Sequence, residues 1–363
     1  MPFSAIDHAH MARALALAER GLFTTQPNPR VGCVIALGDE VVGEGWHQRA
    51  GGPHAEVFAL RDAGERALGA TAYVTLEPCG LHGRTPPCAD ALIAAGIARV
   101  VIAAEDTSQA EGAGLARLRG AGIAVEAGLM RDAARELNVG FFRRIEAGRP
   151  FVRVKLAMSL DGRTALANGA SQWITGEAAR ADGQRWRARS SAILTGSGTV
   201  LADDPRLTVR LPAGTDFAPP LRVVLDRRLR TPVGSHVLDA SAPTLLMHGP
   251  DAVVPEHLAA VECEPVATHG QDLDLGEVLR RLAERGCNEV HVEAGPTLGG
   301  ALLAAGLVDE LLIYMAPVLL GDAARPLLHL PTLAEMDARW RLQVFDQRML
   351  GSDLRLRLRP AAD

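Results

Sequence analysis

The stretch His54-Ala55-Glu56, followed by Glu77-Pro78-Cys79-Gly80-Leu81-His82-Gly83-Arg84-Thr85-Pro86-Pro87-Cys88, decides how the first half of the chain is organised. One histidine and two cysteines form a nitrogen and sulfur ligand set that suits Zn²⁺. Three protein ligands leave a fourth tetrahedral position open for water, as in catalytic zinc sites, whereas structural sites usually fill all four. The pattern therefore predicts a zinc site at His54, Cys79 and Cys88.

Glu56 follows the predicted ligand His54 by two residues. A metal with an open position lowers the pKa of its bound water to about 7 and provides a nucleophile at neutral pH. Attack on an aromatic ring carbon also needs a proton carrier, so we predict Glu56 as the catalytic residue. His-x-Glu, then Pro-Cys and a second Cys, is the pattern of zinc-dependent nucleobase deaminases. Here eight residues, and not two, separate Cys79 from Cys88.

The insert with Gly83-Arg84-Thr85-Pro86-Pro87 resembles the deaminase half of the bifunctional riboflavin-biosynthesis deaminase/reductase family. The runs Pro27-Asn28-Pro29-Arg30-Val31-Gly32 and Gly43-Glu44-Gly45-Trp46-His47 agree with that resemblance. One position departs from it, because the family usually has a histidine where this chain has Leu81, with His82 next to it. The resemblance implies substrate contacts at Asn28, His47 and Arg84.

The rest of the first half predicts an α/β/α layered domain. Residues 31–37 and 41–45 read as a hairpin turning at Gly38-Asp39, and Pro86-Pro87 can start a helix that places Cys88 in its first turn. Gly148-Arg149-Pro150 is the predicted linker, which gives domains at 1–147 and 151–363. Apolar periodicity further predicts helices at 4–20, 54–67, 114–119 and 129–145, and strands at 72–76, 99–104 and 123–126.

The second half begins with an alternating strand and continues as an α/β pattern. The run from Glu293 to Ala301 reads as strand, glycine turn and helix start, whose backbone N–H groups can bind a pyrophosphate. Thr199 follows a strand in a similar way, and Arg187, Arg206 and Arg210 suit a substrate phosphate. Strands are predicted at 151–157, 192–195, 221–225, 244–247, 290–293 and 311–315, helices at 177–189, 275–285 and 298–305, and surface connections at 211–220 and 250–270.

This half resembles the reductase domain of the same family, which implies a dihydrofolate-reductase-like fold and NADPH as cofactor. The implied nucleotide contacts are Ala157, Trp173, Thr199, Asp203, Gly295, Pro296, Thr297, Leu298, Gly299, Gly300 and Ala301. The implied contacts to the ribose-phosphate substrate are Lys155, Ser171, Arg187, Leu207, Arg210 and Glu293.

Length and composition fit a two-domain globular enzyme. The chain has 363 residues, 48% of them hydrophobic and 22% charged. A net charge of −5 argues against a general nucleic-acid binder, and no apolar run approaches the roughly 18 residues of a membrane span. We read Cys33, Cys263 and Cys287 as reduced thiols, which predicts a cytoplasmic protein. We also expect a homo-oligomer.

These observations predict two steps of riboflavin biosynthesis on phosphorylated pyrimidine substrates: zinc-dependent deamination, then NADPH-dependent reduction of a ribosyl group to ribityl. One alternative is a tRNA or nucleoside deaminase with an unrelated, nucleotide-binding C-terminal domain. Another is a nucleotide-binding regulatory protein with a structural zinc, which would release no ammonia and would not need Glu56.

Overall fold

The chain folds into two units, seen in a computed structural model that describes residues 3–80, 87–108 and 113–361. Unit 1 contains Met1–Gly148 together with the short segment Asp216–Ala218. Unit 2 contains Arg149–Thr215 and Pro219–Asp363. The chain therefore passes from unit 2 back to unit 1 for three residues. The predicted ranges 1–147 and 151–363 instead place these residues in the second domain.

Unit 1 is built on a five-stranded sheet in the order β2-β1-β3-β4-β5. The predicted hairpin is confirmed, since β1 and β2 pair in antiparallel fashion and Gly38 adopts a φ of 63° at the turn. β1 also pairs antiparallel with β3, whereas β3, β4 and β5 run parallel. The strands are β1 (Gly32–Leu37), β2 (Glu40–Trp46), β3 (Thr71–Leu76), β4 (Arg99–Ala104) and β5 (Ala124–Ala127).

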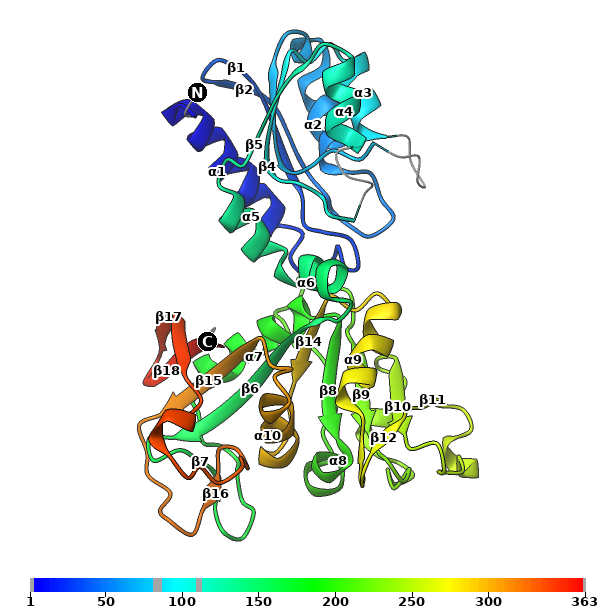
Figure 1. Cartoon of the computed structure of the whole chain (residues 1–363), viewed down its shortest axis with the longest axis vertical. Helices are drawn as coiled ribbons and strands as arrows, with labels where there is room; N and C mark the ends of the chain where they lie inside the picture. The colour runs from blue at the N-terminus through cyan, green and yellow to red at the C-terminus, as the bar shows by residue number, and fades with distance from the viewer. Residues whose placement is uncertain (1–2, 81–86, 109–112, 362–363) are drawn as a thin grey trace. The chain divides into compact units, whose positions relative to one another are not determined.

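Helices cover both faces of this sheet (Figure 1). Alternation along β1 sends Cys33 and Ile35 to a core shared with α2, α3 and α4, and Val34 and Ala36 to a core shared with α1, α5 and α6. The predicted α/β/α layering is therefore present. The helices are α1 (Ala5–Glu19), α2 (Ala55–Ala63) with a 3₁₀ turn at Gly64–Ala67, α3 (Cys88–Ala94), α4 (Ala113–Gly120), α5 (Arg131–Leu137) and α6 (Val139–Ala147).

The single helix predicted at 129–145 is wrong, because Asn138 divides it into α5 and α6. Asn138 is buried and has a non-helical φ of −110°. Its side-chain amide pairs with the backbone of Arg30, accepting from the Arg30 N–H at 2.7 Å and donating to the Arg30 carbonyl at 2.9 Å. An asparagine that can satisfy a buried backbone segment in this way competes with helix continuation.

Two glycines of β2 let the helix α2 approach the sheet closely. A Cβ at Gly43 would lie 2.3 Å from the Ala59 carbonyl oxygen, and one at Gly45 would lie 2.3 Å from the Ala55 carbonyl oxygen. The facing side of α2 is correspondingly made of small, buried alanines. This close packing fixes the start of α2, where the motif residues His54 and Glu56 lie.

Unit 2 is built on a nine-stranded sheet in the order β11-β10-β9-β8-β14-β6-β15-β18-β17. The strands from β11 to β15 run parallel, and β18 and β17 close one edge as an antiparallel hairpin, red in Figure 1. The strands are β6 (Phe151–Ser159), β8 (Ala192–Gly196), β9 (Leu221–Leu225), β10 (Thr244–His248), β11 (Glu262–Pro265), β14 (Glu289–Val292), β15 (Glu310–Ala316), β17 (Leu342–Leu350) and β18 (Asp353–Pro360).

The described part of unit 2 also contains four α-helices, two small two-stranded sheets and 3₁₀ turns at His236–Leu238, Glu256–Leu258 and Met336–Ala338. The helices are α7 (Glu177–Arg189), α8 (Ser197–Asp203), α9 (Leu275–Glu284) and α10 (Pro296–Ala304). The small strand pairs are β7 (Arg163–Ala165) with β16 (Arg325–Pro326), and β12 (Thr268–His269) with β13 (Asp272–Leu273). None of the helices in the described ranges is both long and apolar enough to cross a membrane.

Two predictions about unit 2 are corrected. The stretch 250–270 is not only a surface connection, because it supplies the edge strand β11 and the strand β12. The hairpin of β17 and β18 was not predicted, although Leu354 to Arg359 alternates leucine and arginine, which is the signal of a half-buried strand. The sequence of β17 shows a weaker strand pattern, because most of its residues are exposed and need not alternate between apolar and polar.

Candidate functional site

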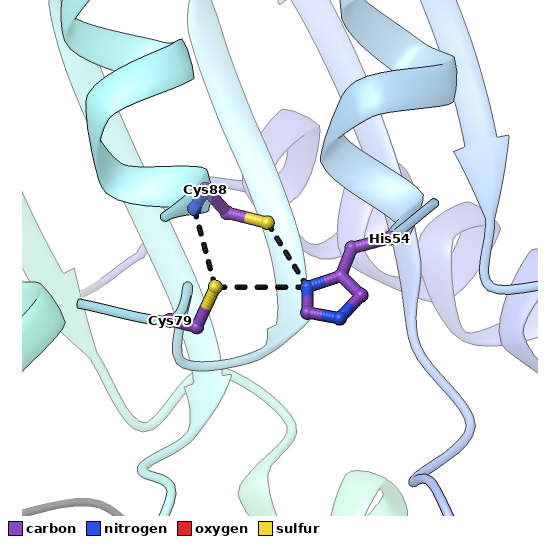
Figure 2. Close-up of side chains that lie close together, drawn as sticks. All are labelled: His54, Cys79 and Cys88. Atoms are coloured by element: carbon purple, nitrogen blue, oxygen red, sulfur yellow. Dashed lines mark hydrogen bonds between the residues drawn. The ribbon is translucent and has the colours of Figure 1, made fainter. Parts of the chain in front are cut away.

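The predicted metal ligands lie together in unit 1. The ligand atoms of His54, Cys79 and Cys88 all lie within 4.8 Å of one another (Figure 2). His54 Nδ1 is 3.1 Å from Cys88 Sγ and 3.6 Å from Cys79 Sγ. Zn–S bonds of about 2.3 Å and Zn–N bonds of about 2.0 Å at a tetrahedral angle separate such atoms by about 3.5 Å. The residues present therefore fit a zinc ion with one open position.

Each ligand is placed at the end of a regular element. His54 is the N-cap of α2, Cys79 follows β3 by three residues, and Cys88 is the first residue of α3. The predicted position of Cys88 at a helix start is thus confirmed. The Cys88 backbone N–H donates to Cys79 Sγ at 3.2 Å, so the start of α3 holds the other thiol in place and favours its thiolate form.

The electrostatics of this cluster favour one thiolate even without a metal. A hydrogen bond from Cys88, aided by His54, lowers the pKa of Cys79 to about 4. The shared proton and burial raise the pKa of Cys88. Burial also raises the pKa of Glu56, whose carboxyl group lies within hydrogen-bonding reach of the Cys88 thiol. Glu56 therefore stands beside the ligands without being one of them.

Two of the three predicted substrate contacts of unit 1 lie next to the cluster. The ring of His47 packs edge-on against the ring of His54, with centroids 5.6 Å apart. His47 Nδ1 contacts the Pro53 carbonyl at 3.0 Å, and His47 Nε2 is 3.1 Å from the Asn28 amide. The third predicted contact, Arg84, lies outside the described residues, as do Leu81 and His82.

Glu77 is a residue of this site that the sequence interpretation missed. It is buried, and its carboxylate accepts the backbone N–H groups of Asp106 and Leu115, each at 3.2 Å. It thereby fixes the exit of β3 two residues before Cys79. A glutamate between an apolar strand and Pro78 was the available signal, because a buried carboxylate in that position needs backbone partners.

Unit 2 holds a wide cleft of about 1430 Å³. Its lining includes residues at the carboxyl ends of β8, β9 and β14 and at the starts of α8 and α10. In parallel α/β sheets, ligands bind at this edge because several helix starts direct backbone N–H groups toward it. A Cβ at Gly295, the N-cap of α10, or at Gly198 would meet nothing within 4 Å, so the backbone there is open to a ligand.

Most of the predicted reductase residues line this one cleft. Gly299 and Gly300 do not line it. A Cβ at Gly299 would press on Leu328, and one at Gly300 on the backbone of His329, so these two glycines allow close packing of α10. The predicted residues that do line the cleft are Lys155, Ala157, Ser171, Trp173, Arg187, Thr199, Asp203, Leu207, Arg210, Glu293, Gly295, Pro296, Thr297, Leu298 and Ala301.

The floor of the cleft contains a half-buried charged group around Glu293. Arg187 Nη2 donates to Glu293 at 2.8 Å, and Arg187 Nη1 donates to the Thr208 carbonyl at 2.8 Å. Although burial opposes ionisation, this arginine holds the pKa of Glu293 well below its usual range. Burial lowers the pKa of Lys155, an effect that the nearby Glu293 opposes. Arg187 therefore already forms an ion pair with the Glu293 carboxylate, whereas the Arg210 side chain makes no ion pair with any described residue.

The cleft is positively charged in a chain whose net charge is −5. Its lining has nine lysine and arginine side chains against five carboxylates. Arg227, Arg228 and Arg230 are among them and were missed in the sequence, although three arginines within four residues after a buried strand are a clear charge pattern. A cleft of this size, with open helix starts and excess positive charge, fits a dinucleotide phosphate together with a phosphorylated substrate.

Comparisons with known proteins cover both units. The family "RibD C-terminal domain" matches residues 150–354, and "Cytidine and deoxycytidylate deaminase zinc-binding region" matches residues 4–104. The riboflavin biosynthesis protein RibD of Escherichia coli (strain K12) is 51% identical over 364 residues, which span 97% of this chain and 99% of that protein. The protein of the same name from Haemophilus influenzae is 47% identical over 99% of both chains.

Two solved structures match over nearly the whole length. Acinetobacter baumannii RibD, form 1, superposes with a TM-score of 0.92 and 46% identity, covering 98% of this chain and 99% of that chain. A Thermotoga maritima protein superposes with a TM-score of 0.87 and 33% identity over the same shares. The latter is described as a diaminohydroxyphosphoribosylaminopyrimidine deaminase/5-amino-6-(5-phosphoribosylamino)uracil reductase.

Proposed function

The chain belongs to the RibD family of bifunctional deaminase/reductases of riboflavin biosynthesis, and we propose that its residues 1–147 carry the deaminase and residues 151–363 the reductase. The predicted fold is confirmed, since a cytidine-deaminase domain is followed by a dihydrofolate-reductase-like RibD C-terminal domain. The observation that carries the division is the separation of the two sites: the zinc ligands gather within unit 1, and the charged cleft lies within unit 2.

The substrate that we propose for unit 1 is 2,5-diamino-6-(5-phosphoribosylamino)pyrimidin-4-one. His54, Cys79 and Cys88 would hold a zinc ion, which when bound would supply a water of lowered pKa at neutral pH. The Glu56 carboxyl group would accept a proton from the attacking water and donate one to the leaving amino group, because it lies beside the ligand set without belonging to it. Asn28 and His47 orient the pyrimidine from the side of His54. Arg84 is proposed as a third contact to this substrate.

The substrate that we propose for unit 2 is 5-amino-6-(5-phosphoribosylamino)uracil, whose ribosyl group is reduced to ribityl. NADPH supplies the hydride when bound, and the open backbone at Gly198, next to Thr199, and at Gly295 supports a place for its phosphates. Lys155 and Glu293 face the substrate from the floor of the cleft. Because Arg187 is paired with Glu293, we assign the substrate phosphate chiefly to Arg210.

A coupled assay with the pyrimidine phosphate tests both halves at once. We expect ammonia release without NADPH, and nicotinamide oxidation only after deamination. A tRNA or nucleoside deaminase would release ammonia from those substrates and oxidise no nicotinamide, and a regulatory protein would do neither. The five free cysteines support a reducing, cytoplasmic compartment, and a homo-oligomer remains our proposal, to be tested by sedimentation.

A further inference from the structure

A fully buried histidine lies next to the charged group on the floor of the cleft. His291 of β14 does not line the cleft, but its Nε2 lies 3.3 Å from Glu293 Oε1. We propose that His291 is a positioning residue of the reductase, whose neutral imidazole donates its Nε2–H to the Glu293 carboxylate and holds that carboxylate toward the substrate. The proposal rests on the reductase function proposed above, in which Glu293 faces the substrate.

The alternation of side chains along β14 places His291 on a charged face of the sheet. Residues two apart in a strand point to the same side, so His291 lies between Glu289 and Glu293. The valines of this strand point to the opposite side, into the main apolar core of unit 2. Helix α7 reaches both glutamates, because Arg189 pairs with Glu289 at 2.8 Å and Arg187 pairs with Glu293. The imidazole therefore lies between two carboxylates that each have an arginine of α7 as a partner.

The surroundings of His291 keep its imidazole neutral. Its neighbours in the strand register are the fully buried Arg153 of β6 and the apolar Ile193 of β8. Burial lowers the pKa of His291, Glu293 opposes this effect, and the positive charges of Arg153 and Arg187 lower the pKa further. A neutral imidazole has one N–H donor and one acceptor nitrogen. Because Nε2 is the nitrogen beside a carboxylate, which can only accept, the proton belongs on Nε2.

The contact between His291 and Glu293 is close but not yet a formed hydrogen bond. Neither ring nitrogen of His291 has a hydrogen-bond partner among the described residues. A buried N–H without a partner costs free energy, so a small rotation that closes the contact to Glu293 is favourable. Hydrogen bonds of catalytic groups are often long in the free enzyme and shorten in the substrate complex. Arg187 would then hold the carboxylate from α7, and His291 would hold it from the sheet.

The test compares three variants of His291 in the full-length protein. In His291→Gln the amide nitrogen can take the place of Nε2, in His291→Asn it can take the place of Nδ1, and in His291→Leu no donor remains. His291→Leu should lower the reductase kcat/KM about 10- to 100-fold, the range for a hydrogen bond to a charged group. His291→Gln should restore most of it, and His291→Asn should not. NADPH affinity, measured by titration, should be unchanged in all three.

The pH profile of the reductase separates positioning from packing. Loss of a donor raises the pKa of the carboxylate that it served, so Glu293 should take up a proton at a higher pH in His291→Leu than in wild type. The acid limb of the kcat/KM profile should therefore move to higher pH in His291→Leu and return in His291→Gln. His248→Gln, at a buried histidine of β10 outside the cleft lining, is the matched control and should leave the profile unchanged.

Nitrogen NMR of histidine-labelled protein gives a readout that needs no reductase activity. The signals lost in His291→Gln belong to His291 and should show a neutral ring with its proton on Nε2. A proton on Nδ1, or a charged ring at neutral pH, would overturn the proposal.

The kinetic outcomes are equally decisive. Wild-type kcat/KM in His291→Leu, equal losses in His291→Leu and His291→Gln, or a parallel loss of NADPH affinity would each overturn the positioning role. If the wild-type protein oxidised no NADPH with the phosphorylated substrate, the proposed reductase would fail, and this role of His291 with it. An unchanged His291→Leu variant of an active wild-type reductase would overturn the role of His291 alone.

Discussion

The two sites of this chain differ in how they are assembled. In unit 1, three ligand atoms within 4.8 Å come from residues 54 to 88, at the starts of two helices and after one strand. In unit 2, the cleft of about 1430 Å³ collects residues from Lys155 to His329 along one edge of a parallel sheet. The first site depends on a few contacts that can each be removed, whereas the second spreads its binding over many backbone and side-chain groups.

This difference sets the expected size of mutational effects. A compact site that performs proton transfer should lose its activity when a single group is changed. A distributed cleft should lose affinity in smaller steps, because neighbouring groups continue to hold the ligand.

Glu56→Gln should have the largest effect on activity. The amide keeps the volume of the side chain but cannot carry the proton, so deamination should fall on the order of 10²- to 10⁴-fold while zinc content and reduction are unchanged. Ammonia release and metal analysis on the same preparation measure this. Glu65→Gln, an exposed glutamate beyond α2, is the control. Near-normal ammonia release from zinc-loaded Glu56→Gln protein would remove Glu56 from the mechanism.

Cys88→Ser should weaken zinc binding by more than the roughly 10- to 100-fold that loss of an outer hydrogen-bond partner costs. A serine hydroxyl is a poor substitute for a soft thiolate, and the hydrogen bonds at the start of α3 do not replace it. Zinc is measured by metal analysis after dialysis against a weak chelator. Cys263→Ser, in unit 2, should retain full zinc. Full occupancy in the Cys88→Ser protein would contradict the ligand assignment.

Arg210→Ala should have a moderate effect, confined to the reductase. Loss of one charge-assisted hydrogen bond to the substrate phosphate, worth about 1.5–3 kcal/mol, should raise the KM for the phosphorylated substrate about 10- to 100-fold. NADPH affinity and deamination should not change. Steady-state kinetics at saturating NADPH measure this, with the exposed Arg348→Ala as control. A variant that lost NADPH affinity and kept its substrate KM would show that the two ligands are placed the wrong way round.

Asn138→Ala should have the smallest effect, since it touches the scaffold of unit 1 and neither site. It leaves the Arg30 backbone N–H and carbonyl without their buried partner, which should cost about 1–3 kcal/mol in the free energy of unfolding. Urea unfolding followed through deaminase activity would measure it. Asn168→Ala, exposed in unit 2, should stay within about 0.5 kcal/mol of wild type. An equally small change for Asn138→Ala would mean that water replaces the lost amide.

The sequence predicted the compact site far better than the distributed one. His54, Cys79 and Cys88 could be assigned because metal chemistry restricts both residue type and spacing, and because Pro86-Pro87 marks a helix start. Glu77 was missed because its partners, Asp106 and Leu115, are distant in sequence. The residues of the cleft were predicted only through the family resemblance. No local sequence pattern relates Lys155 to Glu293, which become neighbours because β14 pairs with β6.

The fold followed the same division. The hairpin at Gly38 and the strands β6, β8, β9, β10, β14 and β15 of unit 2 were predictable from local turn chemistry and apolar runs. The break at Asn138 was not, because its cause is a contact with Arg30, more than a hundred residues away in the chain. Arg227, Arg228 and Arg230 show the remaining difficulty: their charges are visible in the sequence, but their place in the lining of the cleft is a property of the folded chain.

The return of Asp216–Ala218 to unit 1 has a practical consequence for anyone dividing the gene. The Ala218 N–H donates to the Phe23 carbonyl at 2.8 Å, and Asp216 pairs with Arg49, so part of the deaminase unit is encoded within the reductase half. A single break after codon 148 would yield a first fragment without these contacts and a second fragment with an unsupported loop. Two independently expressed halves are therefore not equivalent to the two units, and a one-cut split of this gene should be compared with the intact protein before its parts are assayed as separate enzymes.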